Sequence, residues 1–479
     1  MAKTTKSDNP AKTTGDPTVN SAGPFDVIVI GAGPGGYVCA IRCAQLGMKV
    51  ACVEREAQLG GTCLRVGCIP SKALLTASEH YHQATSELAA FGVTCGKVSL
   101  DLKTMMAHKD KVVSDNTAGV SFLFKKNKVT HLAGTGKITA PGTVDVNGKA
   151  YKAKHIVIAT GSDSADVAGV KVDEKTIVSS TGALALTKVP KTMAVIGGGY
   201  IGLEMASIWS RLGAVVTVIE FAERILPGLD KELATTAARA FKKQKIAFKV
   251  GHKVTKAKRG TVTIEPVAGG KALELAAEVI LVAVGRRPHT AGLGLETVGV
   301  KTDSHGFIVT DARFASTVEG IYAIGDVTTG PMLAHKAEEE GVALAECLAG
   351  QVAEVDHDII PAVVYTEPEI AAVGQTEQAL QEAGVAYKVG KFPFSANGRA
   401  RASRQIDGFA KILADEKTDQ ILGVHIVGAH AGTMIAEAAL AMAFAATAQD
   451  IALTCHAHPT LNEALKEAAL AVAGHPLHI

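Results

Sequence analysis

One pattern occurs twice in this chain and restricts its fold more than any other feature. Residues 25–54 read FDVIVIGAGPGGYVCAIRCAQLGMKVACVE and residues 191–220 read KTMAVIGGGYIGLEMASIWSRLGAVVTVIE, which match at ten of thirty positions at an offset of 166. Each copy has an apolar run, G-x-G-x-x-G, a helical stretch and a second apolar run that ends in Glu. This order is typical of a Rossmann-like dinucleotide-binding unit. The repeat therefore predicts an α/β fold with two nucleotide-binding domains.

The glycines and the terminal acids of the two copies have separate physical roles. Glycine permits the tight turn and lets backbone N–H groups approach a pyrophosphate at the positive end of a helix. The acid, which stands 23 residues after the first glycine, hydrogen-bonds a ribose hydroxyl. The residues assigned on this basis are Gly31, Gly33, Gly36 and Glu54 in the first copy and Gly197, Gly199, Gly202 and Glu220 in the second. Two such sites on one chain suggest two cofactors that exchange electrons.

Glu220 also indicates which nicotinamide nucleotide is used. A 2′-phosphate beside this carboxylate would place like charges about 4 Å apart, which costs on the order of 4 kcal/mol at an effective dielectric constant near 20. That cost corresponds to roughly a thousandfold discrimination against NADP. Arg224 could weaken the repulsion, but Glu223 stands beside it. We therefore expect NAD.

Length, charge and apolar patterning exclude several classes of protein. A chain of 479 residues is long enough for about three domains. The 49 basic and 47 acidic residues nearly cancel, so no nucleic-acid or membrane surface is indicated. Residues 1–24 are polar and contain no arginine, which predicts a disordered tail rather than a signal or transit peptide. We expect a cytoplasmic protein that does not span a membrane.

Two cysteines stand close together in the stretch GTCLRVGCIPSK, at Cys63 and Cys68. Eight cysteines in a long chain without a secretion signal are too few for a disulfide framework. A zinc site would need two further ligands, and no second close pair is suitably placed outside the first repeat. Pro70 suits a first helical turn, which would place Cys68 near a helix N-terminus with Lys72 four residues further on, and both features favour a thiolate. A redox pair is the leading interpretation, with simple packing as the alternative.

Five of the other six cysteines are expected to pack as small hydrophobic residues. They are Cys39, Cys43, Cys52, Cys95 and Cys347.

Disulfide exchange also needs a proton acceptor, and the stretch CHAHPTLNEALKEA offers one. It contains His456, His458 and Glu463, and a histidine oriented by a carboxylate suits general acid–base work. The residues alone do not choose between the two histidines. Either could instead cap the helix expected after Pro459.

Several further motifs follow in order: ATGS at 159–162, VGRRP at 284–288, GDV at 325–327 and MLAHKAEEEG at 332–341. Together with GAGPGG, GGTCLRVGCIPSK, GGGYIGLE and HAHPTLNE, they resemble the flavoprotein disulfide reductases that act on pyridine nucleotides, and within these the dihydrolipoamide dehydrogenases. The resemblance covers nearly everything after residue 24. It implies FAD at the first nucleotide site, NAD at the second and a redox-active disulfide between Cys63 and Cys68.

The resemblance also implies roles for single residues. Cys63 would be the thiol that meets the substrate, Cys68 the thiol against the flavin, His458 the base and Glu463 its orienting acid. The further residues implied for FAD are Thr62, Lys72, Gly136, Thr160, Gly161, Ser162, Asp326, Met332, Leu333, Ala334 and His335. Val254 and Gly285 fall where the family holds NAD, as does Glu204, which would also pair with Lys72 beside the flavin.

The implied fold places an interface domain after the two nucleotide-binding domains. The expected limits are 1–24 for the tail, 25–155 and 156–284 for the FAD and NAD domains, 285–355 for a central domain that completes the FAD site, and 356–479 for an α+β dimerisation domain. The base would reach the disulfide of the other subunit, so a homodimer is expected.

The implied activity is the oxidation of protein-bound dihydrolipoamide with reduction of NAD⁺, and the implied partners are lipoyl domains of 2-oxo acid dehydrogenase or glycine cleavage complexes. Mercuric and large thioredoxin reductases need a C-terminal cysteine pair, whereas this chain ends in GHPLHI. Glutathione reductases favour NADP, and soluble transhydrogenases lack the first cysteine. A reductase of another disulfide and a flavin-bearing structural subunit are the alternatives.

Overall fold

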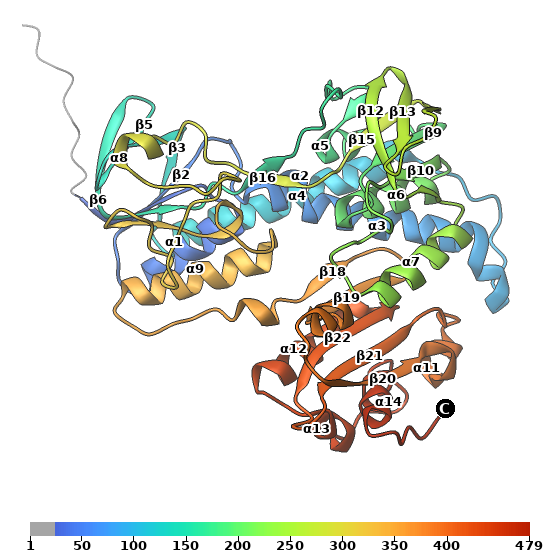
Figure 1. Ribbon diagram of the computed structural model, residues 1–479. Helices are drawn as coiled ribbons and strands as arrows, with labels where there is room; N and C mark the ends of the chain where they lie inside the picture. Colours follow the sequence, from blue (N-terminus) through green and yellow to red (C-terminus); the bar gives the residue numbers. More distant parts are fainter. Residues whose placement is uncertain (1–23) are drawn as a thin grey trace, which may run out of the picture.

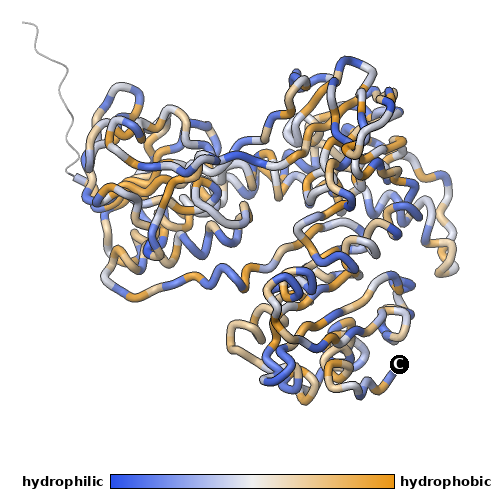
Figure 2. Tube along the Cα trace, viewed as in Figure 1, coloured by the Kyte–Doolittle hydropathy of each residue, from blue (hydrophilic) through white to orange (hydrophobic). Residues whose placement is uncertain are grey.

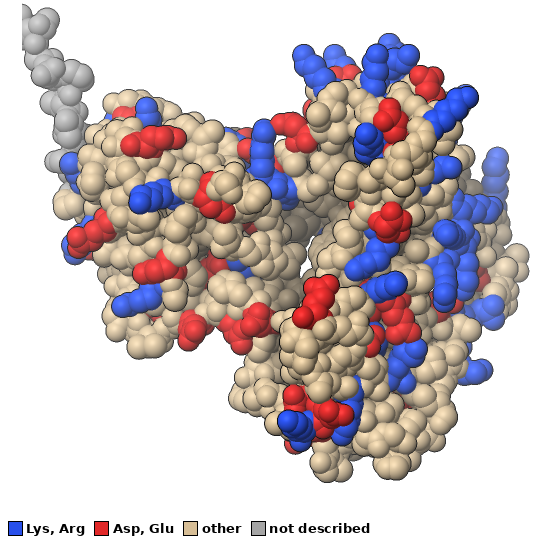
Figure 3. Space-filling view, viewed as in Figure 1, with Lys and Arg blue, Asp and Glu red and all other residues tan. Residues whose placement is uncertain are grey.

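The computed structural model describes residues 24–479, which form three lobes (Figure 1). The predicted disordered tail lies outside the described residues, apart from Pro24. Acidic and basic side chains are mixed over the face seen in Figure 3, in keeping with the balanced composition. Within residues 24–479, none of the helices combines the length and apolar character that crossing a bilayer requires.

The first lobe is built on a sheet whose parallel part carries the first glycine motif. Its parallel strands run in the order β3 (Thr130–Ala133), β2 (Val50–Glu54), β1 (Phe25–Ile30), β6 (Lys149–Ile158) and β17 (Ile321–Ala323). The strands β4 (Gly136–Ala140) and β5 (Thr143–Val146) continue from β6 as an antiparallel meander.

Both faces of this sheet are buried, which explains why β1 and β2 are continuous apolar runs. Val27 and Val29 of β1 face α1 (Pro34–Gln45), α4 (Leu102–Lys126) and α9 (Ala334–Leu348). Ile28 and Ile30 face the opposite way, toward the meander and α8 (Leu295–Val298). The alternation follows the two-residue period of a strand.

The second lobe repeats the arrangement around the second glycine motif. Its parallel strands run in the order β11 (Ala247–Lys249), β10 (Val215–Ile219), β9 (Thr192–Ile196), β15 (Val279–Val282) and β8 (Ile177–Val178). One face packs on α5 (Ser180–Ala183), α6 (Tyr200–Arg211) and α7 (Lys231–Lys243). The other face is covered by the antiparallel strands β12 (His252–Lys258), β13 (Gly260–Pro266) and β14 (Leu273–Ala277).

Two connections join the nucleotide-binding lobes. The chain leaves the first lobe through β7 (Ser162–Ser164) and returns through β16 (Arg286–Pro288), and these strands pair antiparallel. The helices α2 (Gly61–Val66) and α3 (Cys68–His82) follow β2, and α3 packs against α6 of the second lobe. Short helical turns occur at Gln83–Glu87, Leu88–Phe91 and Gly325–Val327.

The C-terminal lobe is an antiparallel sheet with helices. Its strands run in the order β18 (Ala362–Val364), β19 (Glu369–Gly374), β22 (Ile421–Gly428), β21 (Phe409–Asp415) and β20 (Tyr387–Pro393). Its helices are α10 (Glu377–Glu382), α11 (Gly398–Ala402), α12 (Ala431–Ala443), α13 (Ala448–Leu453) and α14 (Glu463–Val472), with short turns at His357–Ile359 and Phe394–Ala396. The central strands β21 and β22 are strongly apolar along their length (Figure 2).

The predicted fold class is confirmed: two Rossmann-like units precede an α+β lobe. The limits expected for each domain stay a prediction. Cys39, Cys43 and Cys52 are buried as expected, and Cys347 is partly buried. The expectation was wrong for Cys95, which is exposed because residues 92–97 run over the surface.

Candidate active site

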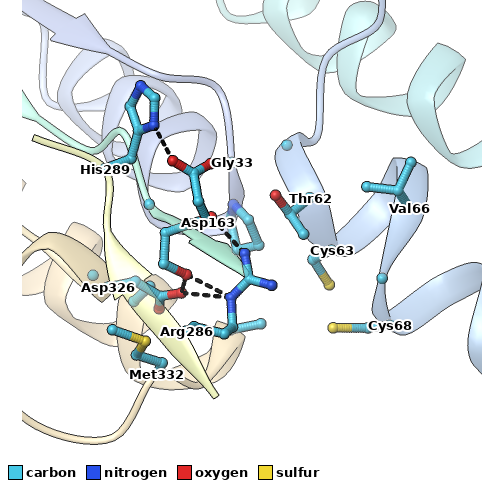
Figure 4. A pocket seen from close by; sticks show the side chains of 18 of the residues that line it. Gly33, Thr62, Cys63, Val66, Cys68, Asp163, Arg286, His289, Asp326 and Met332 are labelled. Atoms are coloured by element: carbon cyan, nitrogen blue, oxygen red, sulfur yellow. Dashed lines mark hydrogen bonds and ion pairs between the residues drawn. The ribbon is translucent and has the colours of Figure 1, made fainter. Parts of the chain in front are cut away.

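The two neighbouring cysteines come from consecutive helices that meet at one glycine. Cys63 lies in α2, and Cys68 is the first residue of α3, as its position before Pro70 predicts. Gly67 makes the turn between them, and a Cβ there would lie 2.9 Å from the carbonyl oxygen of Thr62. Because glycine permits this close approach, the turn brings the two sulfur atoms together (Figure 4).

The surroundings of Cys68 favour its thiolate. A hydrogen bond from the Cys63 thiol, together with the positive charge of Lys72, lowers the pKa of Cys68 to about 7 even though burial opposes the charge. The same hydrogen bond and burial raise the pKa of Cys63 well above its usual range. Since Cys68 begins α3, the helix dipole acts in the same direction as Lys72.

Lys72 is held in place by a carboxylate of the second lobe. Its Nζ lies 2.9 Å from Glu204 Oε2 and 3.0 Å from Oε1, and it stands over the ring of Tyr365 at 4.5 Å. The backbone N–H of Tyr365 donates to the same carboxylate. The three lobes therefore meet at the cation that faces Cys68.

We expect the thiolate fraction of Cys68 to rise with pH through a midpoint near 7. Lys72→Met should move that midpoint upward, because it removes a positive charge and leaves Glu204 uncompensated. The ultraviolet thiolate absorbance of the dithiol protein, titrated with pH and corrected with Cys68→Ser, measures the midpoint. Lys72→Arg keeps the charge and is the control. A Lys72→Met midpoint at or below that of the unaltered protein would contradict the assignment.

The first glycine loop forms a cradle of the size and polarity that a pyrophosphate needs. Gly31 has φ +103°, and a Cβ on Gly36 would overlap the carbonyl oxygen of Gly31, so these two glycines close the turn. By contrast, the nearest atom to a Cβ on Gly33 would be 3.9 Å away, so the middle glycine faces free space. The start of α1 has no side-chain cap, which leaves its N–H groups available to an anion.

The second loop reproduces these features. Gly197 has φ +109°, a Cβ on Gly202 would overlap the carbonyl oxygen of Gly197, and nothing lies within 4 Å of a Cβ on Gly199. The start of α6 likewise has no side-chain cap. The residues present at both loops therefore fit a dinucleotide.

The terminal acids of the repeat occupy equivalent positions. Glu54 accepts hydrogen bonds from the N–H groups of Ala32 at 2.9 Å and Glu56 at 3.0 Å. Glu220 accepts from Gly198 at 2.6 Å and Ala222 at 2.8 Å. Each acid thus braces its own glycine loop and stands where a ribose would lie.

Arg224 does not offset the charge of Glu220. Its guanidinium donates to the carbonyl oxygens of Leu226 at 3.0 Å, Pro227 at 2.7 Å and Leu229 at 2.8 Å. The guanidinium therefore hydrogen-bonds to its own loop rather than to Glu220, which favours NAD over NADP.

Both cradles open into one cavity of about 860 Å³ that also contains the two cysteines. Most of the residues expected at the cofactor sites line it: Gly31, Gly33, Glu54, Thr62, Lys72, Gly136, Thr160, Gly161, Ser162, Asp326, Met332, Leu333, Ala334, His335, Gly197, Gly199, Glu204, Glu220 and Gly285. A shared cavity allows electrons to pass between two dinucleotides and a dithiol.

Five of the expected residues do not line this cavity. Gly36 and Gly202 serve the turn packing described above. Val254 lies in β12 and packs, partly buried, against the sheet of the second lobe. His458 and Glu463 lie in the C-terminal lobe.

The sequence did not indicate that Arg286, Asp163 and His289 lie on the wall opposite the cysteines, beside the expected Ser162 and Asp326 (Figure 4). Arg286 Nε donates to Ser162 Oγ at 2.6 Å, and Ser162 Oγ donates to Asp326 at 2.5 Å. His289 Nδ1 lies 2.6 Å from Asp163 Oδ2 in the same wall. The VGRRP motif contains Arg286, but only the pairing of β7 with β16 brings it to the cavity.

The structure distinguishes the two candidate histidines. His456 is buried, with one ring nitrogen 2.8 Å from Glu437 and the other 3.0 Å from the carbonyl oxygen of Thr454. The His458 side chain is 79% exposed, and its Nδ1 lies 2.9 Å from Glu463 Oε1. Glu463 also accepts from the N–H of Thr460, which fixes the carboxylate. Neither histidine caps α14, whose N-cap is Asn462, and His458 keeps Nε2 free for proton transfer.

Within residues 24–479, no group of three or more potential metal-ligating side chains is arranged around a common point. Two dinucleotide cradles that share a cavity with a cysteine pair instead define a disulfide oxidoreductase linked to pyridine nucleotides. The model of the pyridine nucleotide-disulphide oxidoreductase family matches residues 25–341, and that of its dimerisation domain matches residues 360–469. The chain belongs to this family and, as a member, uses FAD and NAD(H).

Curated relatives match over nearly the whole chain. The mitochondrial dihydrolipoyl dehydrogenase of Pisum sativum is 53% identical over 95% of this chain and 92% of its own length. Dihydrolipoyl dehydrogenase 3 of Pseudomonas putida is 51% identical over 95% of this chain and 99% of its own length. Among solved structures, LpdA from Mycobacterium tuberculosis superposes with a TM-score of 0.84 at 25% identity, covering 93% of this chain and 99% of that one.

Proposed function

We propose that this chain is an NAD-dependent dihydrolipoamide dehydrogenase. The observation that carries the proposal is the single cavity that joins two dinucleotide cradles to the Cys63–Cys68 pair. Relatives about 50% identical over nearly their full length bear the name of this enzyme. A silent structural subunit is not favoured, because the cysteine pair and the His458–Glu463 pair are both intact. A reductase of another disulfide is not favoured, because the relatives named above are dihydrolipoyl dehydrogenases.

The residues of the chain account for the thiol chemistry. His458 Nε2 takes the proton of a dihydrolipoamide thiol, while Glu463 holds Nδ1 and stabilises the imidazolium. The substrate thiolate attacks Cys63 Sγ, the Cys63–Cys68 bond breaks, and Cys68 leaves as a thiolate beside Lys72. The second substrate thiolate then displaces Cys63, which closes the lipoamide disulfide and leaves two reduced cysteines. The first glycine cradle would hold FAD, and a bound FAD would supply the hydride chemistry that links the two reduced cysteines to a nicotinamide in the second cradle.

An anaerobic titration of the purified protein tests the proposal. Dihydrolipoamide should reduce the cysteine pair and change the visible absorbance, and NAD⁺ should reverse the change much faster than NADP⁺. If NADH reduces the flavin but dihydrolipoamide does not, the proposed substrate is wrong and the family assignment stands. A protein unchanged by either reductant would remove the activity.

Glu220→Gln tests the choice of nucleotide. Loss of the charge should reduce the preference for NAD⁺ over NADP⁺, measured as the ratio of the two kcat/KM values, by on the order of a hundredfold. Glu223→Gln removes a neighbouring carboxylate that does not brace the glycine loop and should change the ratio little. Equal effects of the two substitutions would refute a specific role for Glu220.

We also propose that the active form is a homodimer in which His458 of the partner subunit serves each cavity. The family model of a dimerisation domain supports this, as does the position of His458 outside the cavity of its own chain. Large apolar side chains are exposed on the same lobe, among them Leu440 at 61%, Phe444 at 80% and Leu453 at 76%. An apolar surface of this kind is typical of a subunit interface.

A cytoplasmic location and docking to lipoyl domains of 2-oxo acid dehydrogenase or glycine cleavage complexes complete the proposal. The names of the relatives support the docking, because a dihydrolipoyl dehydrogenase acts on a lipoyl group. Cell fractionation and co-purification with lipoylated proteins test them. Enrichment in a membrane or organelle fraction would overturn the location.

A further inference from the structure

A group of buried charges joins the nucleotide-binding second lobe to the C-terminal lobe. Lys411, in β21, is fully buried, and its Nζ lies 2.9 Å from Asp230 Oδ1 and 2.5 Å from Glu377 Oε2. Asp230 belongs to the second lobe and is also fully buried. Charges removed from water in this way persist only when they are closely paired, so the contact constrains both lobes.

Asp230 does more than neutralise Lys411. Its Oδ1 accepts from the N–H groups of Glu232 at 3.0 Å and Leu233 at 3.4 Å, which caps α7. Its Oδ2 accepts from the N–H of Glu377 at 3.3 Å, at the start of α10 in the C-terminal lobe. One carboxylate therefore ties together the first turns of two helices from different lobes and a buried lysine.

The segment that ends at Asp230 begins at the acid of the second cradle. Residues 221–229 connect Glu220 to Asp230, and Pro227 of this segment lines the cavity. The N–H of Leu226 donates to the carbonyl oxygen of Gly198, within the glycine loop. The segment thus touches the nucleotide cradle at one end and is fastened to Lys411 at the other.

We propose that Lys411 is a positioning residue for NAD. Through Asp230 it holds segment 221–229 against the glycine loop, so nucleotide affinity depends on a strand that does not line the cavity. The inference rests on the second cradle being the NAD site. It adds a role for the C-terminal lobe beyond subunit contact.

Lys411→Met in the full-length holoenzyme tests the inference. Hydrogen exchange in peptides covering 221–229 should accelerate about tenfold, and the KM for NAD⁺ should rise about tenfold with kcat nearly unchanged. Reduction of the enzyme by dihydrolipoamide without NAD⁺ should keep its rate. The control is Lys391→Met, which removes a part-exposed ion pair with Glu232 and a contact over the Phe409 ring but leaves the Lys411–Asp230 pair in place. It should leave both quantities as they are.

Asp230→Asn provides a second variant if Lys411→Met does not fold. Asparagine still caps a helix but lacks the charge, so the same exchange and KM effects are expected in weaker form. A lower Tm with unchanged hydrogen exchange and unchanged KM would show that the Lys411–Asp230 contact only stabilises the fold, and would overturn the inference. Failure of dihydrolipoamide to reduce any variant, or the parent, would instead count against the proposed substrate, because the hydrogen exchange of 221–229 is measured without it.

Discussion

Replacing Cys63 with serine should lower the rate of dihydrolipoamide oxidation by at least about a thousandfold, because catalytic groups that act as a unit lose nearly all their effect when one is removed. The serine hydroxyl cannot form the disulfide that the substrate thiolate attacks. The Cys63 side chain belongs to neither glycine cradle, so NADH-driven reduction of an artificial dye should remain. Steady-state rates with dihydrolipoamide and with the dye measure the two activities.

The matched control for Cys63→Ser is Cys347→Ser. Cys347 lies in the last turn of α9 and is partly buried, and its Sγ donates to the carbonyl oxygen of Ala353, which follows the helix. Its replacement should leave both activities near those of the parent. Residual dihydrolipoamide oxidation above about a tenth of the parent rate in Cys63→Ser would show that another thiol carries the exchange.

His458→Gln should slow dihydrolipoamide oxidation by about a hundred- to ten-thousandfold, the usual contribution of a general base. Glutamine can occupy a similar volume but cannot accept the substrate proton at neutral pH. His456→Gln is the comparison, since that ring is buried and both of its nitrogens are already paired, with Glu437 and with the carbonyl oxygen of Thr454. It should lower the Tm more than it lowers the rate. A larger loss of rate in His456→Gln than in His458→Gln would reverse the assignment.

The same variants reveal the subunit arrangement. Cys63→Ser and His458→Gln should each have little activity alone. Reassorted dimers of the two should regain about one quarter of parental activity, because half are mixed and each mixed dimer has one complete site. If base and cysteines come from one chain, mixing restores nothing.

The nucleotide sites were largely predictable because their determinants are local. Thirty residues of each repeat contain the strand, the turn, the helix and the acid, and the close approach of Gly36 to Gly31, which the second copy repeats, lies within one segment. The position of Cys68 at the start of α3 followed from Pro70 for the same reason. Local backbone chemistry determines these features, so the sequence displays them.

Features set by tertiary contacts were not predictable in this way. The choice between His456 and His458 depends on Glu437, which lies on α12 and reaches His456 only in the folded lobe. Arg286 joins the cavity wall through a strand pair more than a hundred residues apart in sequence. Cys95 was misjudged because residue type alone indicates burial, whereas the segment around it crosses the surface.

In each copy the acid is hydrogen-bonded directly to its own glycine loop. Among the described residues, the Glu54 carboxylate accepts only from the N–H groups of Ala32 and Glu56, and the Glu220 carboxylate only from those of Gly198 and Ala222. Coenzyme preference can therefore be re-engineered around residue 220 while flavin retention at the other copy is inherited unchanged. In evolutionary terms, a duplicated motif of this kind allows substitutions to change one nucleotide site of an electron-transfer protein without first impairing the other site.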